Sequence, residues 1–184
     1  RLQLEFSFDN CPYTVTWTSS PTDVTGTGTS TSTDASGAIF PVGVTTVTYT
    51  ITENEDNGNG IQSSTCDIIV TVIDDETPMI TCPANVTIGT SMGGIDDCEG
   101  EYTWTHPSPT DNCGVTVYTI TYTNPDGTTE GPINLIGLGG TSVTRDFYKG
   151  LTTMLYRVEE DAGNFIECTF TVLVEEEEEH MIFC

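Results

Sequence analysis

Cysteines and carboxylates are the residues of this sequence whose number and spacing bear most directly on chemistry. The chain contains 7 Cys and 28 Asp and Glu, against only 4 Lys and Arg. No two cysteines form a CxxC pair, so their spacing does not match that of a zinc site. Cysteines spread along a chain in this way are typical of disulfides, which persist in oxidising compartments. We therefore expect an extracellular chain, either secreted or displayed on a cell surface.

The carboxylates suit calcium better than other metal ions, because calcium binds several oxygen ligands at once. The candidate ligands are Asp74, Asp75, Glu76, Glu160 and Asp161. A cation near residues 74–76 would stiffen a joint between two parts of the chain. The alternative is that these acidic stretches are solvated and bind nothing, which is also the expectation for the carboxylate run 175–179.

The strong acidity excludes several classes of partner. A formal net charge of −24 repels phosphate backbones and anionic lipid, so we expect neither nucleic-acid nor membrane-surface binding. No apolar run is long enough to span a membrane as a helix. His106 and His180 each lack a neighbouring Cys or second His, which disfavours a metal or catalytic centre. We expect no enzyme activity and no cofactor other than calcium.

Three sequence features recur at the same spacing of 102 residues. Cys66 is matched by a cysteine at 168, Cys82 by a cysteine at 184, and the Asp-Asn-Cys triplet 9–11 by an identical triplet at 111–113. A spacing shared by three features indicates a tandem duplication. The stretch Cys66–Cys82 is the joint between the two copies, because an apolar β-branched run there meets an acidic, proline-containing break.

Alternation of apolar and polar residues predicts strands along the whole chain, and no segment has helical periodicity. Trp17 and Trp104 lie in alternating segments, so we expect both rings in a core; the alternative is that they form exposed platforms for sugar rings. A new strand should begin at Met79, after the break. The predicted strands are 2–8, 13–18, 44–51, 66–73, 102–106, 115–123, 133–138, 142–147, 152–159 and 166–175.

Four motifs together resemble the hyalin repeat (HYR), an immunoglobulin-like β-sandwich module of extracellular proteins. They are Cys82-Pro83, the two Asp-Asn-Cys triplets, the stretch 40–49 (FPVGVTTVTY) and Asp161-Ala-Gly-Asn before Cys168. The resemblance implies an all-β chain of two tandem immunoglobulin-like sandwiches. The first, 1–76, would lack its N-terminal strand, and the second, 77–179, would be complete. Residues 180–184 would begin a following repeat or form a donated strand.

The resemblance also implies two disulfides in the second module, Cys82–Cys168 and Cys98–Cys113. Cys11, Cys66 and Cys184 then remain. By the repeat spacing, the partners of Cys66 and Cys11 would fall before the first residue of the sequence. We therefore expect Cys66 to bond Cys184 of another subunit, while Cys11 stays unpaired or finds another partner. The alternative is that the missing partners belong to the same polypeptide in a longer tandem array.

Glycosylation is expected at the surface. Asn85-Val-Thr is an N-glycosylation sequon, and the hydroxyl-rich stretch 25–33 offers O-glycan acceptors at Thr27, Thr29 and Thr31.

The family is known for adhesion and scaffolding. We therefore expect a structural subunit of an extracellular fibre or surface array, a head-to-tail homopolymer assembled by terminal strand addition. The alternatives are an adhesive module that binds a carbohydrate or a cell-surface ligand, and an accessory domain of a secreted enzyme.

Overall fold

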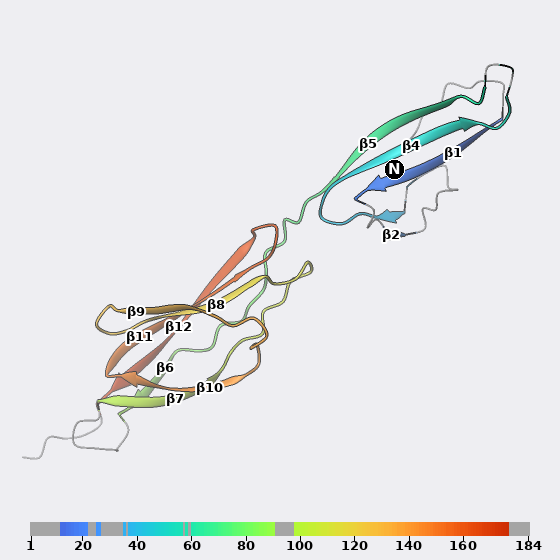
Figure 1. Ribbon diagram of the computed structural model, residues 1–184. Helices are drawn as coiled ribbons and strands as arrows, with labels where there is room; N and C mark the ends of the chain where they lie inside the picture. Colours follow the sequence, from blue (N-terminus) through green and yellow to red (C-terminus); the bar gives the residue numbers. More distant parts are fainter. Residues whose placement is uncertain are drawn as a thin grey trace, which may run out of the picture. The chain divides into compact units, whose positions relative to one another are not determined.

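The computed structural model in Figure 1 describes residues 12–21, 25, 26, 35, 37–56, 58, 60–90 and 98–176. All of the regular elements in these ranges are β-strands, which confirms the predicted all-β class. The chain divides into a first unit, Arg1–Asp74, and a second unit, Asp75–Cys184. Within the described ranges, no helix has the length and hydropathy needed to cross a membrane.

The first unit is built on a three-stranded antiparallel sheet with the order β1-β4-β5. Trp17 of β1 lies opposite Tyr49 of β4, which lies opposite Cys66 of β5. A two-residue pair, β2 with β3, accompanies this sheet. The small core consists of Val15, Trp17, Ala35, Val47 and Tyr49. The bounds are β1 Tyr13–Ser20, β2 Thr25–Gly26, β3 Ala38–Ile39, β4 Gly43–Glu53 and β5 Ser63–Val72.

The abundance of threonine in the first half of the sequence follows from this sheet. Side chains alternate between the two faces of a strand, so the residues that alternate with Val15 and Trp17 along β1, and with their buried partners along β4, point away from the core. On that outer face, Thr18 lies opposite Thr48, whose hydroxyl donates to Asp67 at 2.7 Å. Threonine suits such a half-exposed pleated surface because its β-branched side chain packs well while its hydroxyl is solvated.

The second unit contains a five-stranded sheet with the order β6-β12-β11-β8-β9 and a two-stranded sheet of β7 and β10. Neighbouring strands run antiparallel except β6, which pairs with β12 in parallel. The bounds are β6 Val86–Gly89, β7 Glu99–Thr105, β8 Val117–Thr123, β9 Thr129–Asn134, β10 Ser142–Tyr148, β11 Gly150–Glu159 and β12 Phe165–Glu175.

The two sheets of the second unit enclose its core, as expected for a β-sandwich. Trp104 occupies the centre, because its ring contacts Phe147 of β10 and Phe170 of β12 from opposite sheets. From Thr152 to Val158, every second residue of β11 is fully buried, which matches the alternation of its sequence. The buried apolar residues are Trp104, Tyr118, Ile120, Tyr122, Leu135, Phe147, Met154, Tyr156, Val158, Phe170, Val172 and Val174.

Two strand predictions were wrong. The segment from Met79 on forms only one isolated bridge, to Thr110, and the first strand of the second unit is β6 at 86–89. The strand expected at 133–138 lies earlier, at Thr129–Asn134, and contains Pro132. Proline is accepted there because β9 is the edge strand of its sheet, so one side of β9 needs no amide donors. The predicted strand at 2–8 lies outside the described residues.

The repeat spacing is confirmed in three dimensions. Cys66 of β5 lies opposite Tyr49, and Cys168 of β12 lies opposite Tyr156 in the same way. The two units differ along the other edge of this strand, the edge that faces away from β4 in the first unit and from β11 in the second. Strand β12 has β6 along its other edge, whereas β5 has no neighbouring strand there in the part of the chain that the structure describes.

Gly100 of β7 should not tolerate a side chain. An added Cβ would lie 2.8 Å from the carbonyl oxygen of Gly89 and 3.0 Å from Cδ1 of Ile88. Overpacking of this kind costs about 1–3 kcal/mol, so Gly100→Ala should lower the free energy of unfolding by that amount in a urea titration. The control is Glu101→Ala, at an exposed position of the same strand. An alanine variant as stable as the parent would show that β6 and β7 are less closely packed than described.

Candidate functional site

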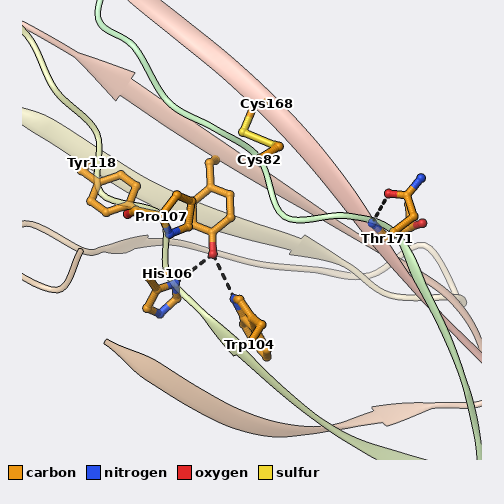
Figure 2. Close-up of a disulfide and its surroundings, with 9 residues drawn as sticks. Cys82, Trp104, His106, Pro107, Tyr118, Cys168 and Thr171 are labelled. Carbon is orange, nitrogen blue, oxygen red and sulfur yellow. Dashed lines mark hydrogen bonds between the residues drawn. A yellow bond between two sulfur atoms is a disulfide. The ribbon is translucent and has the colours of Figure 1, made fainter. Parts of the chain in front are cut away.

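The described cysteines define the most distinctive chemistry of the chain. Cys82 and Cys168 form the disulfide that the family resemblance implied, with an S–S distance of 2.07 Å and a Cα–Cα distance of 5.8 Å (Figure 2). The bond ties the segment before β6 to strand β12, across a sequence separation of 86 residues. It therefore fixes the start of the second unit to β12, a strand that also contributes buried residues to the core.

The other predicted disulfide, Cys98–Cys113, was wrong. Cys98 is exposed and its thiol is free. Its backbone carbonyl oxygen accepts a hydrogen bond from the backbone N–H of Lys149, next to the start of β11. Cys113 lies three residues before Thr116 in the sequence. The backbone N–H of Thr116 donates to the carbonyl oxygen of Glu159, at the opposite end of β11. A ten-residue strand is about 30 Å long. The two cysteines therefore lie far beyond the Cα separation of about 7 Å that a disulfide requires.

Cys66 is a second free, exposed thiol, at the position that corresponds to Cys168. The residues that follow it on the same side of β5, Ile68 and Val70, are only partly buried. Their counterparts in the second unit, Phe170 and Val172, are completely buried. The predicted partner Cys184 lies outside the described residues, as does Cys11, so the Cys66–Cys184 bond stays a prediction.

The calcium candidates do not gather into one site. Glu160 is buried, and its two carboxylate oxygens accept the amides of Ala162 and Asn164, which closes its own turn. Glu76 accepts a hydrogen bond from Asn112 at 3.0 Å, while Asp75 and Asp161 are exposed and Asp74 is buried. Among the described residues, no three His, Cys, Asp or Glu side chains lie close enough to hold a metal ion.

Both tryptophans are buried, at 7% exposure for Trp17 and 5% for Trp104, which confirms that they belong to the cores. A stacking platform for sugar rings needs an exposed aromatic face, and neither ring offers one.

His106 is buried in a polar network of the second unit (Figure 2). The hydroxyl of Tyr156 accepts the indole N–H of Trp104 at 3.0 Å and lies 2.9 Å from Nδ1 of His106. Burial lowers the pKa of His106 and raises the pKa of Tyr156 to about 12. Because the Tyr156 hydroxyl has a single proton, the network is complete when it donates that proton to a neutral imidazole. His106 therefore acts as a structural residue of the core.

Acidification should destabilise the second unit through His106. The imidazole has a pKa of 6.5 outside the fold and a lower pKa inside it, so below pH 6.5 the unfolded chain binds more protons than the folded chain. Stability from this group is complete above pH 6.5 and is lost as the pH falls below it. Urea midpoints measured from pH 7.5 to pH 5 should fall, and the fall should be smaller for His106→Gln. Equal slopes in the two proteins would contradict this role.

One motif was missed by the sequence reasoning. Gly89–Gly93 reads Gly-Thr-Ser-Met-Gly, which matches the Gly-x-Ser-x-Gly pattern of hydrolase nucleophiles. That pattern requires a strand followed by a helix, and a positioned base. Strand β6 ends at Gly89, Ser91 lies outside the described residues, and no helix follows in the described part.

The sequon residue Asn85 is exposed, immediately before β6. Its side-chain oxygen accepts the backbone N–H of Thr171 at 2.9 Å, which orients the amide and leaves the nitrogen available (Figure 2). Glycosylation of Asn85 stays a prediction. The same holds for Thr27, Thr29 and Thr31, which lie outside the described residues.

Comparison with known protein families gives a match within the first unit. Residues 4–72 match the family model of the HYR domain. A search of curated proteins found no match. The matched range covers nearly the whole first unit and includes β1, β4 and β5.

Proposed function

Because residues 4–72 of this chain form an HYR domain, a module of extracellular adhesion-type proteins, we propose that the chain is a structural building block of an extracellular fibre or surface array. In such an array the chains associate head to tail, so that the contact does not close by two-fold symmetry and growth continues.

The observation that carries this proposal is the open edge of the first unit. Strand β5 has an unpaired outer edge in the described structure, at the position where β12 is covered by β6. An uncovered sheet edge presents backbone donors and acceptors that readily pair with another chain. The partial exposure of Ile68 and Val70 adds apolar surface beside this edge. Both features favour association with a further segment of chain.

Composition supports the same role. A net charge of −24 keeps such a surface soluble until a specific partner docks, because like charges oppose non-specific association. Among the alternatives, sugar binding on tryptophan platforms loses its support because Trp17 and Trp104 are buried.

Electron microscopy and denaturing gels together test the proposal. The purified chain, concentrated under mildly oxidising conditions, should form fibres or ordered arrays. The material should dissociate on reduction and denaturation to one band near 19.8 kDa, plus the mass of any glycans. A monodisperse monomer at all concentrations would contradict the proposal. Native material that stays many times heavier after reduction would instead identify a continuous tandem array.

A further inference from the structure

We propose that the Cys82–Cys168 disulfide is a redox-controlled stop against stretching, which keeps the second unit from unfolding when the chain is pulled from its two ends. A member of a fibre carries tension along its chain, so this inference rests on the proposed function for its setting. The mechanical behaviour itself belongs to the single chain. Reduction of the bond should convert the second unit from an inextensible module into an extensible one.

The position of the disulfide along the chain gives it this role. The polypeptide enters the second unit at Asp75, and the last described strand, β12, ends at Glu175. Cys82 lies near the entry, before β6, and Cys168 lies in β12 on the way to the exit (Figure 2). A force applied to the two ends therefore passes through the S–S bond, and the chain between the two cysteines is shielded from it.

The shielded segment contains almost the whole second unit. It includes strands β6 to β11 and most of the buried core residues, from Trp104 to Val158. In the fold its two ends, Cys82 and Cys168, are only 5.8 Å apart between Cα atoms. A fully extended chain with the same sequence separation of 86 residues spans roughly 280–310 Å. The intact bond withholds this length from any extension of the chain.

A second feature resists the same force once the bond is broken. Strand β6 runs parallel to β12, and force then acts on the N-terminal end of β6 and on the C-terminal end of β12. In a parallel pair these two ends lie at opposite ends of the ladder, so the force slides the strands along each other and loads their hydrogen bonds together. The side chain of Asn85 lengthens the ladder, because its Oδ1 accepts the backbone N–H of Thr171 at 2.9 Å.

The switch is operated by thiol–disulfide exchange. Cys82 and Cys168 are both partly exposed, so a small dithiol such as dithiothreitol can reach the bond. The S–S bond breaks, and the two cysteines gain two electrons and two protons in total as they become thiols. Dithiothreitol is oxidised to its own cyclic disulfide, and a disulfide oxidant reverses the exchange.

Single-molecule force spectroscopy on the full chain, tethered at its two termini, tests the proposal. Addition of dithiothreitol to the stretched parent chain should release a further contour length of roughly 280–310 Å, set by the separation of 86 residues. The double variant Cys82→Ser/Cys168→Ser should reach the longer contour length without reductant and should not gain this step when the reductant is added. Cys98→Ser removes an exposed free thiol and should behave as the parent chain does.

A second pair of variants tests the parallel ladder in the reduced chain. Asn85→Ala should lower the force at which the second unit opens, because it removes the bond to Thr171. Thr87→Val is the matched control, since it removes the same glycosylation sequon but keeps Asn85, and its opening force should equal that of the parent. Equal forces for all three chains would exclude Asn85 from the ladder.

Two outcomes would overturn the stop itself. One is release of the full length from the parent chain before reduction. The other is no release after reduction, with both thiols shown to be free by alkylation and mass spectrometry. One molecule is pulled at a time, so the readout is independent of the array. A chain that never forms fibres can still show the step, and a chain that forms fibres yet lengthens without reductant would keep the proposed function and lose this inference.

Discussion

Replacing Phe170 by alanine should lower the free energy of unfolding of the second unit by about 3–5 kcal/mol, the usual cost of emptying a buried aromatic site. Phe170 is completely buried in β12, its ring stacks on Tyr156 at 6.0 Å, and it lies 6.1 Å from the ring of Trp104. Denaturant unfolding followed by hydrogen exchange in β11, the strand paired with β12, measures this loss.

Two further substitutions make this result specific. Phe165→Ala, on the same strand, removes a ring that is 49% exposed and should have a much smaller effect. Ile68→Ala changes the residue that corresponds to Phe170 in the first unit, where the side chain is only partly buried. It should cost less than half as much as Phe170→Ala. Similar losses for Ile68 and Phe170 would mean that the first unit buries this strip as fully as the second.

Removing the Cys82–Cys168 disulfide should have an effect of similar size. With a separation of 86 residues between the two cysteines, the chain-entropy account attributes about 4–5 kcal/mol of stability to the bond. The double variant Cys82→Ser/Cys168→Ser avoids leaving a reactive thiol in the fold. Its urea midpoint should fall sharply, and the parent chain should show the same fall after reduction.

Cys98→Ser is again the control, because that thiol is exposed and makes no disulfide. Surface substitutions of this kind change stability by about 0.5 kcal/mol or less. If reduction left the unfolding midpoint of the parent chain unchanged, the bond would not contribute to the stability of the second unit. If Cys98→Ser lowered stability as much as the double variant, Cys98 would itself contribute to the stability of the second unit.

The sequence by itself determined the class of the chain, most of its strands and its internal duplication. Alternation in segments such as 152–159 is a local property, since one face of a strand meets the core and the other meets solvent. The repeat spacing correctly placed Cys66 and Cys168 at equivalent positions, because duplicated sequences fold into equivalent strands. The burial of Trp17 and Trp104 could be predicted for the same local reason.

Only the tertiary structure decided which side chains meet. Cys98 and Cys113 are close in sequence, yet the intervening strand β7 places them toward opposite ends of the second unit. Glu160 is one of several acidic residues in the sequence, but its turn directs both of its oxygens to backbone amides. The separation of Cys98 from Cys113 depends on how the strands are ordered in the sheets, and local residue patterns do not encode that order. The Glu160 contacts form within one turn, but which of the acidic residues turns inward depends on the packing around it.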